Sequence, residues 1–153
     1  YEARGAYSNE FLQVVRALWA EGPASFHGEF FDFDEIVASP KPLQRRLPIV
    51  VGGNRPPALR RAARLGDGWH PMQLSPDGVR KRLQVMRTEA GALGRDHVAE
   101  TVQVRLDMGR VTAESLPEYA DAGVTELVLS LNTANAEDIE VGITRFAAAF
   151  IAP

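Results

Sequence analysis

Two glycines followed by an asparagine are the first feature of this sequence that suggests chemistry. Gly52-Gly53-Asn54 comes directly after the apolar run Ile49-Val50-Val51 and before an expected helix that begins near Pro57. Glycines let a backbone approach a phosphate closely, and the N–H groups at a helix N-terminus point toward such an anion. The pattern predicts an anion-binding turn, although a Gly-Gly turn with a capping Asn also occurs for purely structural reasons.

The residues after the glycines decide which groups would bind the anion. Pro56 and Pro57 have no N–H to donate. Donors are therefore expected from Gly53, Asn54, Arg55 and either Ala58 or Leu59. The guanidinium of Arg55 is a candidate clamp on the same anion.

A second candidate segment is Asp67-Gly68-Trp69-His70, interpreted as a short strand. The segment is expected at the carboxyl end of the sheet, where barrel active sites assemble. Trp69 would pack against the planar ring of a ligand, or else it is an ordinary core aromatic. His70 is a candidate proton carrier or phosphate donor near neutral pH, with a structural histidine as the alternative.

Other polar residues favour simpler interpretations. His27 and His97 lie in turn-like sequence and are expected to be solvated, and no spacing typical of metal ligands is present. The absence of Cys excludes disulfides, thiolate zinc sites and cysteine nucleophiles. The basic runs Arg60-Arg61 and Arg80-Lys81-Arg82 are expected on the outward faces of helices.

These residues must be positioned by a regular series of elements. A helix is expected over Ser8–Trp19 with Phe11 on its apolar stripe, followed by an excursion over residues 22–47 that contains a hairpin. Four strand-helix units follow. Their strands are predicted at Ile49–Val51, Asp67–His70, Val102–Met108 and Glu126–Leu131.

Local signals predict where the helices begin. Ser75 is expected to cap one helix, the Ser115-to-Glu118 spacing matches a capping box, and Asn135 is expected to cap the last helix. The last helix is expected to bury four apolar side chains, namely Ile139, Ile143, Phe146 and Phe150.

Strands separated by helices predict an α/β fold with a parallel sheet, either open or part of a TIM barrel. Arg105, Asp107 and Glu126 place polar side chains on one face of two strands, which favours a barrel interior. A complete (β/α)8 barrel needs about 250 residues. The 153 residues therefore predict a single domain that forms the second half of such a barrel, in which Arg105 and Glu126 would form an ion pair.

The composition limits the partners. With 17 basic and 20 acidic residues the formal charge is −3, which provides no broad positive field for a nucleic acid. No apolar stretch approaches the roughly 20 residues of a membrane span. We therefore expect neither nucleic acid nor membrane as a partner, and the absence of Cys favours a cytoplasmic protein.

Several motifs together carry a family resemblance. They are Leu18-Trp19, Phe26–Phe31, Pro40-Lys41-Pro42, Gly52-Gly53-Asn54 and Ala62–Trp69. In this order and spacing the chain resembles the luciferase-like monooxygenase superfamily, with the deazaflavin-dependent oxidoreductases as the nearest branch. The resemblance covers residues 1 to about 71 through motifs, and the remainder through topology.

The resemblance implies a barrel that binds FMN or the deazaflavin coenzyme F420 at its carboxyl-terminal mouth. The cofactor would transfer a hydride to or from a substrate, or activate oxygen when it is a flavin. The resemblance assigns Gly52-Gly53-Asn54 to the cofactor phosphate, with the segment Asp67-Gly68-Trp69 close by. Arg55, the candidate clamp on the anion, completes the predicted cofactor-binding residues.

The chain also departs from the family, because it corresponds only to the part of the barrel after the fourth strand. The early-strand residues where the family's proton-transfer His usually lies are absent. A half barrel has two unpaired edges, so we expect it to recruit its missing N-terminal half or to form a homodimer, and to be inactive alone. Two alternatives stay open: a non-enzymatic binding or dimerisation module, and a barrel lyase or isomerase that binds a phosphorylated ligand.

Overall fold

The computed structural model describes residues 3–44, 46–95, 99–133 and 135–151, so the prediction for His97 lies outside the described residues. Its elements follow the chain in the order α1 (Arg4–Trp19), β1 (Ala24–His27), β2 (Asp32–Ile36), β3 (Val50–Gly52), α2 (Pro56–Leu65), β4 (Gly68–His70), α3 (Pro76–Gly91), β5 (Thr101–Asp107), η1 (Met108–Arg110), α4 (Ser115–Asp121), β6 (Glu126–Ser130) and α5 (Ala136–Phe150).

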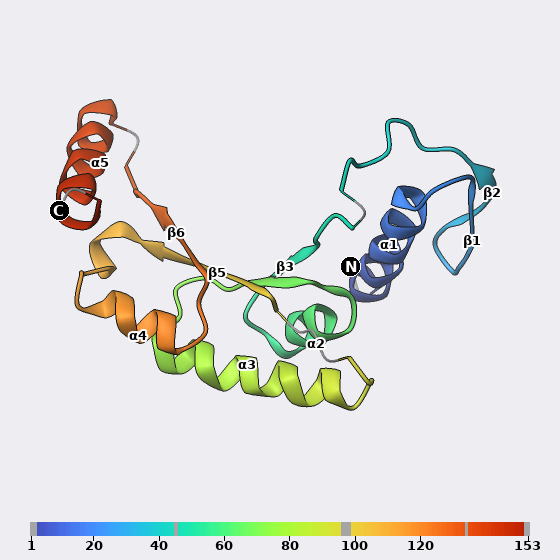
Figure 1. Ribbon diagram of the computed structural model, residues 1–153, viewed down its shortest axis with the longest axis horizontal. Coiled ribbons are helices and arrows are strands. Elements are labelled where there is room, and N and C mark those ends of the chain that lie inside the picture. The colour runs from blue at the N-terminus through green and yellow to red at the C-terminus, as the bar shows by residue number, and fades with distance from the viewer. Residues whose placement is uncertain (1–2, 45, 96–98, 134, 152–153) are drawn as a thin grey trace.

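The central feature is a four-stranded sheet in the order β3-β4-β5-β6, in which all neighbours are parallel. One helix connects each strand to the next, and α2, α3 and α4 lie together on one side of the sheet (Figure 1). This is the strand-helix repeat of half a (β/α)8 barrel, as the sequence predicted. A separate two-stranded hairpin, β1-β2, lies beside α1 within the predicted excursion.

The core lies between the sheet and these helices. The alternating residues Val102, Val104 and Leu106 of β5 are buried, which confirms the period-two prediction. On α3 the buried residues are Val79, Leu83, Met86 and Ala90, and Ser75 caps this helix by accepting from the Gly78 N–H.

The opposite face of the sheet carries most of the polar strand residues, together with Val50 and Val128, and its side chains range from half-buried to exposed. Arg105 and Glu126 lie there, yet they do not form the predicted ion pair because the register places Arg105 opposite Val128 and Gln103 opposite Glu126. The Glu126 carboxylate instead accepts a hydrogen bond of 2.8 Å from the Gln103 amide. The polar interior of a half barrel is thus present without the predicted charge pair.

Two helix predictions were wrong in detail. The first helix begins at Arg4 rather than Ser8, and it buries Val14 while Phe11 is exposed. The predicted capping box at Ser115 does not form, because the Ser115 hydroxyl donates to the Thr112 carbonyl and accepts from the Thr112 N–H.

The last helix also differs from the prediction. Asn135 caps α5 as expected by accepting from the Glu137 N–H, but none of the four apolar side chains predicted to be buried is buried. Ile139 and Ile143 are exposed, whereas Phe146 and Phe150 are half-buried and stack on each other. The physical reason is position, because α5 follows β6, the edge strand of the sheet, and no strand of the described residues lies beyond β6 for it to cover (Figure 1).

Candidate functional site

The loop Gly53-Asn54-Arg55 connects β3 to α2 at the carboxyl edge of the sheet. Gly53 has a φ of +117°, and a Cβ atom added there would lie 2.9 Å from the Ala58 Cβ. Both observations require glycine at this position. Gly52, by contrast, is exposed, and the nearest atom to an added Cβ would be the His70 carbonyl oxygen at 3.9 Å.

Every backbone carbonyl of this loop is engaged by a donor of the protein. The indole N–H of Trp69 donates to the Gly53 oxygen at 2.8 Å, and the Arg82 Nε donates to the Asn54 oxygen at 3.2 Å. The Arg55 oxygen accepts from the N–H groups of Ala58 and Leu59 as α2 begins. The loop therefore has no carbonyl available to repel an anion.

The N–H groups of the loop divide into two sets. Gly53 donates to the His70 oxygen at 3.2 Å, and Ala58 and Leu59 donate to Arg55, so these three predicted donors are already used. The N–H groups of Asn54 and Arg55 donate to none of the described residues. The predicted anion turn thus offers two free N–H groups.

The side chain of Asn54 fixes the loop to the next strand. Its Nδ2 donates to the Met72 oxygen at 2.7 Å, and its Oδ1 accepts from the Met72 N–H at 3.0 Å. This reciprocal pair joins the carboxyl ends of β3 and β4. The guanidinium of Arg55 is exposed beside it, next to the N-terminus of α2, where the helix dipole also favours an anion.

His70 ends β4 at the same edge of the sheet, one strand away from the loop. It is half-buried, and its imidazole makes no hydrogen bond to the described part of the chain. Trp69 next to it is fully buried between the sheet and the helices, so its ring belongs to the core.

Asp67 and Gly68 lie at the other end of β4, which corrects the expectation that the whole segment sits at a carboxyl end. The Asp67 carboxylate binds Arg16 and Arg46, each at 2.5 Å, and the Ile49 N–H at 2.8 Å. Burial opposes ionisation, but these hydrogen bonds together outweigh it and lower the pKa of Asp67 from its ordinary 3.8. A Cβ at Gly68 would meet the Thr101 oxygen at 2.8 Å, so this glycine permits close strand packing.

Sequence reasoning missed two residues of the carboxyl edge. Arg82 was assigned to a solvated face, yet it is half-buried against the loop. Its spacing of three residues from the buried Val79 and four from Met86 is the signal that places it beside the buried stripe of α3.

Asp107 at the end of β5 is the second missed residue, although the alternation of β5 placed it on the polar face. Its carboxylate accepts from the Ser130 hydroxyl at 3.1 Å and the Asn132 amide at 2.9 Å. Desolvation raises the pKa of Asp107, but hydrogen bonds from Ser130, Gln73 and Asn132 and the charge of Arg110 lower it overall.

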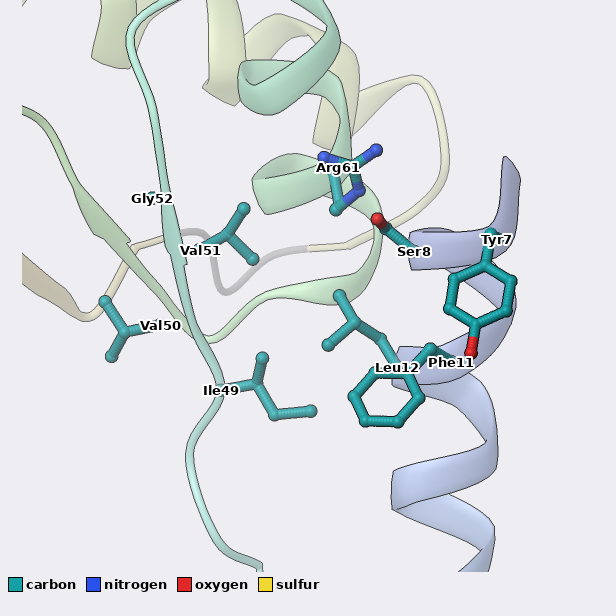
Figure 2. Close-up of a pocket in the computed structure, with 9 residues that line it drawn as sticks. All are labelled: Tyr7, Ser8, Phe11, Leu12, Ile49, Val50, Val51, Gly52 and Arg61. Atoms are coloured by element: carbon teal, nitrogen blue, oxygen red, sulfur yellow. The ribbon is translucent and has the colours of Figure 1, made fainter. Parts of the chain in front are cut away.

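A cleft of about 340 Å³ lies between α1 and the edge of β3 that does not pair with β4. Figure 2 shows side chains of α1 on one side of the cleft and those of β3 on the other. Its walls are mostly apolar and comprise Tyr7, Ser8, Phe11, Leu12, Ile49, Val50, Val51, Gly52 and Arg61. Arg61, predicted to point outward, instead donates to Asn9 and to the Gly5 carbonyl of α1.

The described residues contain no group of three or more His, Cys, Asp or Glu side chains able to hold a metal ion. None of the helices that the structure describes is both long and apolar enough to cross a membrane.

Comparison with known proteins identifies the family. The model of the luciferase-like monooxygenase family matches residues 1–145, so the chain belongs to this family. An uncharacterized Mycobacterium tuberculosis protein, Rv0953c, is 31% identical over 140 residues, which is 91% of this chain and 48% of the relative. The FMNH2-dependent dimethylsulfone monooxygenase of Pseudomonas putida is 33% identical over 95 residues, covering 61% of this chain and 26% of that protein.

Solved structures show the same fold at low sequence identity. An F420-dependent secondary alcohol dehydrogenase matches 99% of this chain and 62% of its own, with a TM-score of 0.78 and 16% identity. The coenzyme F420 dependent tetrahydromethanopterin reductase of Methanopyrus kandleri matches 94% of this chain and 62% of its own, with a TM-score of 0.70 and 13% identity. The chain spans about half the length of the Mycobacterium relatives it matches.

Proposed function

We propose that this chain is part of an oxidoreductase or monooxygenase that uses FMN or coenzyme F420 and acts on a small molecule. Its loop Gly53-Asn54-Arg55 binds the phosphate of that cofactor. The observation that carries the proposal is the composition of the loop: two free N–H groups, and three carbonyls that are all engaged. When bound, the cofactor supplies hydride transfer or, as a flavin, oxygen activation.

The surroundings of the loop fit a phosphate. Gly52 leaves the backbone open to close approach, and Arg55 provides a positive charge without having to break an existing ion pair among the described residues. The N-terminus of α2 adds a favourable dipole. His70, on the neighbouring strand end, is our candidate to hold or move a proton through its unbonded imidazole.

A titration tests the cofactor assignment. FMN and coenzyme F420 are each added to the protein, and the cofactor's own fluorescence reports binding. Gly53→Ala should weaken binding of the preferred cofactor at least about tenfold, because a side chain is strained at this φ and meets Ala58. The matched control is Gly91→Ala, where an added Cβ has nothing within 4 Å.

The outcomes separate the alternatives. If neither cofactor binds to the chain or to a longer form that contains the preceding half, the redox assignment is wrong. Binding of simple phosphate esters without affinity for either cofactor would instead favour a barrel lyase or isomerase. If Gly53→Ala and Gly91→Ala bind the cofactor equally well, the loop is not part of the cofactor site.

We also propose that the chain works together with a second half barrel of four strands. β3 and β6 each have one edge without a strand partner in the described residues, and the cleft beside β3 is apolar. The described residues contain five α-helices for the four strands of the parallel sheet, with α1 before β3 and α5 after β6. Since a closed barrel has one helix for each of its eight strands, the complementary half would bring four strands and three helices.

The number of helices in the chain disfavours a homodimer that closes the barrel. Two copies would bring ten helices to eight positions, so that α5 of one copy and α1 of the other would compete for the same seam. Light scattering of the purified chain tests the point, together with co-expression with the first half of the Mycobacterium relative. A stable complex of one chain with one N-terminal half is expected, whereas a tight dimer that ignores that half would support a dimerisation module.

A further inference from the structure

The geometry of a peptide group links each carbonyl of the loop to the N–H that follows it. A trans peptide is planar, and its C=O and N–H point in opposite directions. Fixing the Gly53 carbonyl therefore fixes the direction of the Asn54 N–H. In the same way, fixing the Asn54 carbonyl fixes the direction of the Arg55 N–H, which is the second free donor.

The two side chains that fix these carbonyls come from different elements. Trp69 belongs to β4, is fully buried, and uses the single donor of its indole on Gly53 at 2.8 Å. Packing on all sides leaves this ring one position, so the donor is rigid.

Arg82 reaches the loop from α3. Its Nε donates to the Asn54 oxygen at 3.2 Å, while its Nη1 donates to the Gly78 oxygen at 3.1 Å. Two bonds to the planar guanidinium set its orientation, which a single bond to a flexible ammonium would not do.

We infer that Trp69 and Arg82 are positioning residues that aim the N–H groups of Asn54 and Arg55 at the cofactor phosphate. This inference rests on the proposed function and deepens it by naming what holds the loop in its binding form. Without either donor, the corresponding peptide plane loses the hydrogen bond that orients it, although Asn54 still anchors the loop to Met72. A rotation of that plane would then turn a carbonyl oxygen toward the phosphate in place of an N–H.

Two variants with matched controls test the inference. Trp69→Phe removes one loop donor, and its control Tyr119→Phe removes a buried aromatic donor that bonds the Leu74 carbonyl outside the loop. Arg82→Met removes the other donor, and its control Arg87→Met removes an exposed charge from the same helix. Arg82→Lys keeps the charge and N–H donors on a single nitrogen, but it loses the planar fork, so it serves as the conservative variant.

The measurement is an amide NMR titration with inorganic phosphate, accompanied by a cofactor titration and a thermal melt for each variant. In the parent chain, phosphate should shift the amide signals of Asn54 and Arg55. Trp69→Phe and Arg82→Met should each weaken phosphate binding about tenfold, the effect of losing one oriented donor. Arg82→Lys should recover part of the affinity, and both controls should bind as the parent does.

The results distinguish a failure of the proposed function from a failure of the positioning role alone. A parent chain whose Asn54 and Arg55 signals ignore phosphate and whose cofactor titration is negative overturns the proposed function, and this inference with it. A parent chain that binds, together with variants that bind equally well at a temperature where all are folded, overturns the positioning role alone. If Trp69→Phe does not fold, Arg82→Met and its control decide the question.

Discussion

The two ends of the parallel sheet treat polar groups in opposite ways. At the amino end, the Asp67 carboxylate is surrounded by Arg16, Arg46 and the Ile49 N–H, so charge and hydrogen-bonding capacity are met within the chain. At the carboxyl end, the loop after β3 engages its carbonyls and leaves the N–H groups of Asn54 and Arg55 open.

The difference separates a structural cluster from the proposed cofactor-binding loop. Both segments contain conspicuous polar residues near glycines, and sequence alone assigned both to the cofactor. A buried polar group normally finds its partners within the protein, so a rigid loop that keeps donors unpaired is arranged for something outside it. The Asp67 cluster ties α1 and residue 46 to the sheet and leaves nothing to offer a ligand.

The largest loss of stability should come from removing the Asp67 carboxylate at the amino end of the sheet. Asp67→Ala leaves two guanidinium groups and the Ile49 N–H without their acceptor and should lower the free energy of unfolding by about 2 to 3 kcal/mol. Urea denaturation measures the loss. The control is Asp77→Ala, whose carboxylate forms an exposed pair with Arg80 and should change stability by less than about 0.5 kcal/mol. Equal, small losses in both variants would contradict this view of Asp67.

Acid should weaken the same cluster. The pKa of Asp67 is lower in the folded chain than its ordinary 3.8, so the unfolded chain binds the proton more readily. The contribution is therefore fully present above pH 3.8 and is lost as the pH falls through the folded pKa. Urea denaturation over a pH series should show the difference between the parent chain and Asp67→Ala as constant at neutral pH and shrinking in acid. If the difference in the free energy of unfolding between the parent chain and Asp67→Ala grows in acid, the pKa of Asp67 is not lowered by folding.

A smaller loss of stability, with a large loss of binding, is expected at the carboxyl end. Asn54→Asp cannot donate to the Met72 oxygen and brings a negative charge to the loop. Stability should fall by about 1 kcal/mol, and FMN or phosphate affinity at least about tenfold. Denaturation and fluorescence titration measure the two effects. Gln84→Glu adds the same charge on an exposed position of α3 and should leave both unchanged.

The smallest effect on stability and on phosphate affinity is expected from replacing the exposed Arg55. Arg55→Met should leave unfolding within about 0.5 kcal/mol of the parent, since the side chain has no partner among the described residues. Phosphate affinity should fall about threefold and depend less on salt, because one screened charge is lost. Arg60→Met, which removes an exposed charge from the adjoining helix α2, is the control for titrations at two salt concentrations. Identical salt dependence in the two variants would exclude Arg55 from the site.

Much of the fold was accessible from local pattern. The alternation of β5 and the four-position stripe of α3 predict buried faces correctly, because one strand or one helix already defines which residues share a face. Caps at Ser75 and Asn135 depend only on neighbouring residues and were predicted correctly. The capping box at Ser115 was not, because the Thr112 backbone competes for the same hydroxyl.

The candidate site was accessible only in part. The residue types of Gly53 and Asn54 predict the turn. The sequence around them does not show that Trp69 and Arg82 donate to its carbonyls. Those contacts join residues 16 and 28 positions apart in the chain and exist only once strands and helices have packed.

By itself, the sequence determined the repeat of strand and helix and the glycine turn, because each depends on residues within a few positions of one another. The parallel sheet followed from that repeat, since strands separated by crossover helices run in the same direction. Tertiary structure alone decided that Asp67 faces the amino end, that Arg105 and Glu126 stay apart, and that the loop presents donors without acceptors. These outcomes depend on strand register and on the direction of each peptide plane, which are set by contacts between distant segments.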